Sequence, residues 1–249
     1  MTIYITSVRS FAETIRNARE RAATLARSLS DAIARARTFT DPDLSDQGVA
    51  AKRAELEATF RAAAQTDLQK LTAEVSHARQ YLAQAARENT QLPNDAAGLI
   101  RAEQKWRQVE KILDAGGDLL SQIRTADADT ALAIAEFGPS WVQAQSVRPQ
   151  GLTGAVAAGL TPDGVQGGDP AASVRRAVSA RLADVTTDPT LAELLRVDSA
   201  ADGHVATVEP WLTAASNLVE YGTADLLGAA LASQIAQPST EPAPAEAAA

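Results

Sequence analysis

The chain has 249 residues, of which 45% are hydrophobic and only 4% aromatic, and its formal net charge is −8. It contains no cysteine, which excludes disulfides, thiolate nucleophiles and cysteine-based metal or iron–sulfur sites. Seven Arg oppose three acids in residues 1–40, whereas ten acids oppose a single Arg in residues 182–249. The acidic total and the scattered arginines argue against nucleic acid as a partner.

No targeting or membrane segment is predicted. The first residues lack a basic region followed by a long apolar run, so we expect no signal peptide. The best apolar stretch, residues 226–236, is about half as long as a membrane span requires. We therefore expect a protein of the cytoplasm, or of a virion, that does not bind membranes.

A heptad-like pattern runs through residues 8–37, 49–88 and 95–124. In each segment the apolar residues follow one another in steps of three and four, which places them on one side of an α-helix. The predicted fold class is all-α: an elongated antiparallel three- or four-helix bundle that resembles a coiled coil, occupying residues 8–137. An intermolecular coiled coil is the alternative. In the first segment the pattern comprises Phe11, Ile15, Ala18, Ala22, Leu25, Leu29, Ala32 and Ala36.

Cap and break signals divide this half of the chain. Ser10 and Glu13 match a capping box, so the first helix is predicted to begin near Ser10. Asn94 or Asp95 is expected to cap the third helix. A short fourth helix is predicted from Asp127 to Phe137, ending at Gly138 and Pro139.

The composition changes in the second half. Residues 138–169 are rich in Gly and Pro and are predicted to be a linker. Shorter helices are expected over residues 170–236, and residues 237–249 are predicted to be a disordered acidic tail. The predicted helix boundaries in this region are Asp169-Pro170, Asp188-Pro189, Pro210-Trp211 and Gly222.

Residue types that carry catalysis are sparse. Only two histidines occur, His77 and His204, and neither has a second ligand at helical spacing. His204 is expected in a loop. The chain has no Gly-x-Ser-x-Gly motif and no phosphate-binding Gly-Lys-Ser/Thr motif. We therefore predict no catalytic residue, no cofactor, no metal and no small-molecule substrate.

Two further hypotheses about chemistry stay open. An enzyme would need a pocket between the two halves of the chain. Carboxylates in two short segments could bind Ca²⁺ weakly, although capping of helix starts accounts for them more simply. The residues concerned are His204, Asp198, Asp202 and Glu209 for the pocket, and Asp41, Asp43, Asp46, Asp127 and Asp129 for Ca²⁺.

Three aromatic residues, Trp141, Trp211 and Tyr221, are the candidates for contact with a partner. Trp106 lies on the heptad pattern and is expected in the core. Trp141 and Trp211 lie at predicted segment boundaries, where an indole ring either packs against a junction or contacts a partner. Tyr221 completes the set of possible interface residues.

Tyr221 and Asp225 have the Tyr-x-x-x-Asp spacing. In this respect the segment resembles the substrates of mycobacterial-type specialised secretion, which are helical hairpins. Those hairpins also carry Trp-x-Gly at their turn, and here Trp141 is followed by Val142 and Gln143. The resemblance implies that the segment around Tyr221 is a docking signal.

Together these features predict a non-enzymatic structural, assembly or interaction protein. A virion-associated or scaffolding-type protein of a bacteriophage with a GC-rich host fits this character. It would self-associate, or dock on a repetitive protein partner, through its N-terminal helices. The alternatives are a helical secretion substrate or adaptor of a GC-rich bacterium, and an enzyme.

Overall fold

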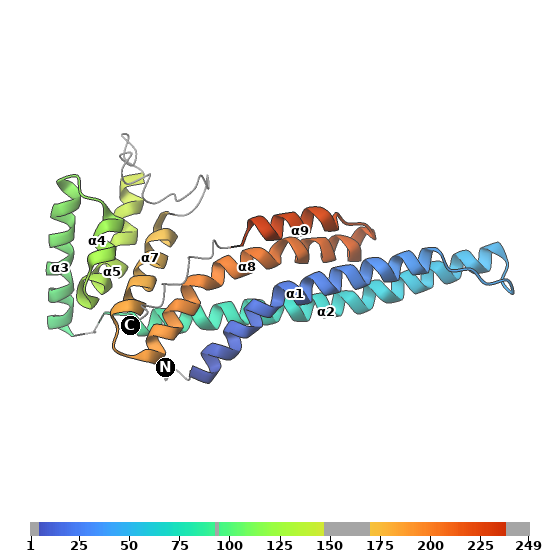
Figure 1. Cartoon of the computed structure of the whole chain (residues 1–249), viewed down its shortest axis with the longest axis horizontal. Helices are drawn as coiled ribbons and strands as arrows, with labels where there is room; N and C mark the ends of the chain where they lie inside the picture. Colours follow the sequence, from blue (N-terminus) through green and yellow to red (C-terminus); the bar gives the residue numbers. More distant parts are fainter. Residues whose placement is uncertain (1–4, 93–94, 147–169, 238–249) are drawn as a thin grey trace, which may run out of the picture. The chain divides into compact units, whose positions relative to one another are not determined.

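The structure, a computed structural model, describes residues 5–92, 95–146 and 170–237 (Figure 1). This part of the chain forms an all-α bundle of eight helices without a β-strand, as the heptad pattern predicted. None of its helices is both long enough and apolar enough to span a membrane. The helices are α1 (Ile5–Arg37), α2 (Asp46–Asn89), α3 (Ala96–Asp114), α4 (Leu119–Thr125), α5 (Ala128–Ser146), α7 (Pro170–Val185), α8 (Pro189–Tyr221) and α9 (Leu226–Ile235).

The chain divides into two compact units. Unit 1 comprises Met1–Arg9 and Tyr81–Ser199, and unit 2 comprises Ser10–Gln80 and Ala200–Ala249. Helices α1, α2 and α8 contribute residues to both units. The predicted N-terminal bundle, residues 8–137, is thus shared between the two units.

In unit 2, α1 and α2 form an antiparallel hairpin (Figure 1). Arg21 of α1 pairs with Glu74 of α2 at 2.6 Å, and Arg37, further along α1, pairs with Glu57, earlier in α2. Because residues later in α1 pair with residues earlier in α2, the two helices run antiparallel.

The heptad pattern of α1 faces the core, as predicted. Its residues are buried except Phe11 and Leu25, which are half-buried. The corresponding residues of α2 continue the same hydrophobic core, among them Leu71 and Val75. The second half of α8 and helix α9 complete this core, through residues that include Val208, Trp211, Ala215, Leu218 and Ala229.

Unit 1 is built around α5, which packs against α7 and α3, while α4 packs on α7. Trp106 of α3 is buried, as its heptad position predicted, and its ring lies 6.0 Å from the ring of Phe137. The fully buried side chains of this unit come from six helices and include Val8, Leu82, Leu119, Ile123, Ile134, Val142, Val174, Val178, Leu194 and Leu195.

The predicted third helix, residues 95–124, is broken in two. Asp95 caps α3 as expected, by accepting a hydrogen bond from the backbone N–H of Gly98. Gly116 has a φ of +90°, a conformation that favours glycine and ends the helix. Asp118 then caps α4, accepting from the N–H of Ser121 at 2.8 Å.

Two prolines that were predicted to bound helices lie inside them instead. Helix α5 continues through Pro139, and α8 continues through Pro210. Each proline lacks the N–H that would bond to the preceding turn, but burial of the surrounding turns outweighs this loss. Gly138 helps, because its missing side chain leaves space for Ile134 and for Val174 of α7.

The predicted linker and tail lie mostly outside the described residues. Residues 138–146 belong to α5, which shortens the predicted linker at its start. The rest of the linker, 147–169, and the tail from residue 238 fall in the parts of the chain that the structure leaves undescribed.

Candidate protein-interaction site

The last helix of unit 2, α9, is held in place at both ends. At its start, the turn after α8 passes through Gly222, whose φ is +69°. Asp225 then caps α9, and its carboxylate accepts a hydrogen bond from the N–H of Gly228 at 2.8 Å. The turn therefore fixes the direction in which α9 leaves α8.

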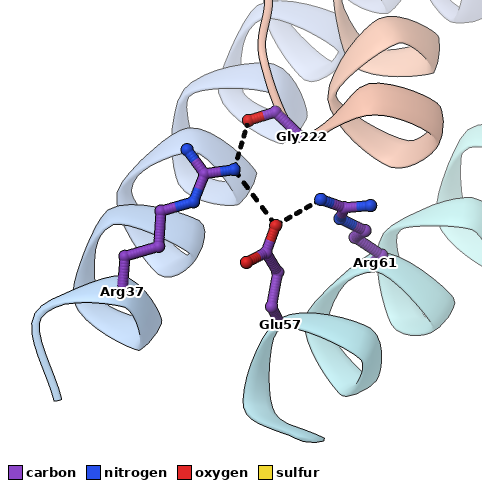
Figure 2. A network of polar contacts seen from close by, with 4 residues as sticks. All are labelled: Arg37, Glu57, Arg61 and Gly222. Carbon is purple, nitrogen blue, oxygen red and sulfur yellow. Dashed lines mark hydrogen bonds and ion pairs between the residues drawn. The ribbon is translucent and has the colours of Figure 1, made fainter. Parts of the chain in front are cut away.

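A polar network joins this turn to the α1–α2 hairpin (Figure 2). Arg37 of α1 donates through Nη2 to the backbone carbonyl of Gly222 at 3.1 Å and to Glu57 of α2, also at 3.1 Å. Arg61 of α2 donates to the same oxygen of Glu57. The hydrogen bond from Arg37 is the main cause that lowers the pKa of Glu57 below its usual value, so the carboxylate stays ionised near neutral pH.

A second polar contact holds the other end of α9. The side chain of Ser233 is fully buried, and its Oγ donates to the backbone carbonyl of Thr207 in α8 at 2.7 Å. The same Oγ accepts a hydrogen bond from Nε of Arg19 in α1 at 2.8 Å. Because a buried hydroxyl is costly to leave unbonded, Ser233 fixes how α9 is rotated about its axis.

The rotation turns three large apolar side chains outward. Leu227 is 80% exposed, Leu231 60% and Ile235 84%. They follow one another in steps of four and lie roughly 120–200° around the helix from Ser233. The buried side of α9 presents the small residues Ala229 and Ser233, and Leu226 is partly buried against the same core. We call these three exposed residues the α9 ridge.

This arrangement differs from that of an ordinary surface helix, because three of the four large apolar residues of α9 are exposed. An amphipathic helix in a soluble protein buries its large apolar residues and exposes polar ones. Helix α9 has no charged side chain at all from Leu226 to Ile235. A contiguous group of exposed large apolar side chains is typical of a protein-binding surface.

The three predicted interface residues occupy different environments. Tyr221, at the end of α8, is 64% exposed and lies just before the turn that leads to α9. Trp211 is buried in the core of unit 2, where the guanidinium of Arg27 lies 4.9 Å from its ring. Trp141 is half-buried within α5 of unit 1. Only Tyr221 is thus exposed close to the α9 ridge in the sequence.

The residues of the enzyme hypothesis are engaged in other ways. His204 lies within α8, not in the predicted loop, because the helix continues through its Asp-Gly-His segment. Partial burial and the neighbouring charge of Arg16 lower its pKa. Asp202 pairs with Arg79 at 2.6 Å, and Glu209 is exposed. The fourth residue, Asp198, belongs to unit 1.

The other histidine and the first acidic segment have local roles. His77 is exposed on α2, and its ring meets the ring of Phe11 edge-on at 5.4 Å. Asp41 accepts a hydrogen bond from the N–H of Asp43, which is an Asx-type turn. Within the described ranges, no three His, Asp or Glu side chains are grouped so that they could hold a metal ion.

An open groove of 540 Å³ lies between α1 and α2. It is lined by Leu25 and Leu71 at its floor and by charged residues at its edges, including the paired Arg21 and Glu74. Three acids and two bases line the groove, Glu20, Asp67 and Glu74 against Arg21 and Lys70.

The second acidic segment gives a pH-dependent prediction. Hydrogen bonds from Thr130 and Lys105 lower the pKa of Asp127 from 3.8 to about 2. Because the pKa is lower in the folded state, Asp127 stabilises the fold above about pH 4, and this contribution is lost as the pH falls toward 2.

We expect Asp127→Asn, which keeps the capping oxygen but loses the charge, to show a smaller loss of stability between pH 4 and pH 2 than the wild type. Urea unfolding at pH 5, 3.5 and 2 measures this difference. Asp129→Asn, which leaves the pair with Lys105 intact, is the control. Equal pH dependence of the wild type and Asp127→Asn would contradict the assignment.

No protein-family model, no curated protein and no solved structure matches the chain. The sequence already held one signal for the α9 ridge. Residues 226–236 stood out as the best apolar stretch, and large residues recur there in steps of four. Which side of the helix is buried, however, follows only from the position of Ser233.

Proposed function

We propose that this chain is a non-enzymatic assembly or interaction protein that binds a protein partner through the α9 ridge and the neighbouring Tyr221. The observation that carries the proposal is the exposure of Leu227, Leu231 and Ile235 on a helix whose rotation is fixed by Ser233. Leaving large apolar side chains in water forgoes about 1.5–3 kcal/mol for each one that could be buried. A partner that covers the ridge recovers this energy.

The proposed surface differs from the N-terminal helices that the heptad pattern suggested. In α1 and α2 that pattern is already covered within the chain, by the two helices themselves and by α8. These residues therefore lie in a hydrophobic core, whereas the side chains of the α9 ridge are 60–84% exposed. The narrower hypothesis of a bacteriophage virion or scaffolding protein continues to rest on composition alone.

Photo-crosslinking in the cell that naturally expresses the protein tests the proposal. A photo-reactive phenylalanine analogue is placed at Leu231, and at Ile112 as a matched control, because Ile112 is also an exposed apolar helical residue but lies on α3. We expect a defined protein adduct from position 231 and none from position 112. No adduct from position 231, or the same adducts from both positions, would refute it.

A secretion substrate or adaptor is the second candidate, and the exposure of Tyr221 favours it. A docking tyrosine has to be accessible, and Tyr221 is, whereas Asp225 of the same motif already caps α9. We expect Tyr221→Ala to fold normally and to abolish export if this candidate is correct. Unchanged export of Tyr221→Ala would remove it.

A further inference from the structure

Helix α9 buries little of its own surface. Among its ten residues only Ala229 and Ser233 are buried, while Leu226, Gly228 and Ala230 are half-buried. The other five residues are exposed, and they include the three of the α9 ridge. Because hydrophobic stabilisation scales with the apolar area removed from water, this helix gains little from its contact with the core of unit 2.

The second half of α8, in contrast, is held firmly in the same core. Val208, Trp211 and Leu218 are each at most 3% exposed. In addition, Arg37 donates to the carbonyl of Gly222, which lies after the end of α8 and before the start of α9. This contact keeps the end of α8 in place whether or not α9 is docked.

Two hydrogen bonds hold the last turn of α9 on the core. The Ser233 hydroxyl donates to the carbonyl of Thr207 in α8 and accepts from Arg19 in α1. When α9 leaves the core, water bonds to all three groups, so none of them is left buried without a partner. The net contribution of each of these bonds to docking is therefore modest.

Ten residues are also too few for a stable helix in water. Isolated helices shorter than about 12–15 residues are marginal even when they are rich in alanine. Helix α9 therefore depends on docking for its helical form, so that separation from the core and loss of the helix are one event. Segments with few buried apolar contacts open in this way without global unfolding.

From these observations we infer that α9 opens as a unit, separating from α1 and α8 at the turn between Gly222 and Asp225 far more often than the rest of unit 2 unfolds. The open state comprises about 1–10% of the molecules. Because the α9 ridge is an ordered surface only while α9 is docked, a partner that binds the ridge selects the docked state. This consequence rests on the proposed function, whereas the opening itself does not.

Hydrogen–deuterium exchange of the full-length chain, read by mass spectrometry of peptic peptides, tests the inference. We expect the backbone amides of residues 229–236 to exchange about 10–100-fold more slowly than in an unstructured chain, and those of residues 207–220 about 1,000-fold more slowly or beyond. Equal protection of the two segments would overturn the inference, because α9 would then open only together with α8. An unprotected α9 would overturn it as well, because the helix would not be docked.

Ser233→Ala separates local opening from a loss of global stability. It removes both hydrogen bonds of the hydroxyl but keeps a small buried side chain, so the amides of α9 should exchange about 3–10-fold faster while those of α8 stay unchanged. Ser216→Ala is the matched control, because Ser216 is exposed on α8, and it should alter neither helix. An equal effect of Ser233→Ala on both helices, or no effect on α9, would overturn the inference.

The two proposals can fail separately, because exchange is measured on the protein alone and photo-crosslinking reports the partner. Exchange of α9 as expected, without an adduct from position 231, overturns the proposed function and leaves the opening of α9 in place. A defined adduct from position 231, with α9 protected as strongly as α8, overturns the opening and leaves the proposed function in place.

Discussion

We expect Gly222→Ala to lower the free energy of unfolding by about 1.5–3 kcal/mol, of which the backbone accounts for about 1–2 kcal/mol and displacement of the polar network in Figure 2 for about 0.5–1 kcal/mol. Alanine at a positive φ costs about 1–2 kcal/mol in any environment. At Gly222 an added Cβ would also lie 2.8 Å from Nη2 of Arg37 and 2.9 Å from Oε1 of Glu57, and it would overlap Arg61. The substitution thus forces apart the groups that fix the α8–α9 turn.

Gly116 provides a matched control, because it has a φ of +90° but no atom within 4 Å of an added Cβ. Gly116→Ala should therefore cost only the backbone part, about 1–2 kcal/mol. Urea unfolding followed by far-UV circular dichroism measures both variants. Equal effects of the two substitutions would show that the network around Glu57 adds nothing to the conformational cost of the turn.

Trp211→Ala is expected to destabilise the protein by about 3–5 kcal/mol, since Trp211 is only 3% exposed and lies at the centre of the unit 2 core. The loss includes its contact with the guanidinium of Arg27, which contributes about 0.5–1 kcal/mol at a partly exposed site. The cavity that remains is bordered by α1 and by the neighbouring residues of α8.

Trp141 is the appropriate comparison for this substitution. It is half-buried within α5, so Trp141→Ala should cost less, about 1–2 kcal/mol. Tyr221→Ala, at a site that is 64% exposed, should change stability by less than about 0.5 kcal/mol. A smaller effect of Trp211→Ala than of Trp141→Ala, measured by urea unfolding, would contradict the assignment of Trp211 to the core.

Much of the fold followed from the sequence because its main signal is periodic. A buried position such as Ala22 or Leu71 recurs with the spacing of a helix, and burial of that side is what stabilises the helix. Capping residues such as Asp95 act on the backbone of the next few residues, so their effect is local as well. Local physics of this kind can be inferred without tertiary structure.

The helix boundaries predicted from the sequence were wrong where tertiary packing outweighs a local preference. Pro210 was predicted to begin a helix, yet the buried Val208 and Trp211 on either side keep α8 continuous. Gly116, in contrast, falls within the predicted helix over residues 95–124, yet its positive φ ends α3 there. Neither outcome follows from residue type alone.

The interaction site was the least predictable feature. The exposure of Leu231 depends on the rotation of α9, which depends on the buried hydroxyl of Ser233 and its partners Thr207 and Arg19. Thr207 is 26 residues away from Ser233, and Arg19 is 214 residues away. Contacts at such separations leave no periodic signal in the sequence.

The alanines of α1 have a consequence for how this gene can diverge. Ala18, Ala22 and Ala26 have no exposed surface, so the hairpin closes on methyl groups with no space beside them. Adding a single methylene there would push neighbouring backbones apart, at a cost of about 1–3 kcal/mol. Residues larger than alanine should therefore be selected against at these three positions. The leucines of the same hairpin can exchange with methionine or isoleucine, which have similar volumes.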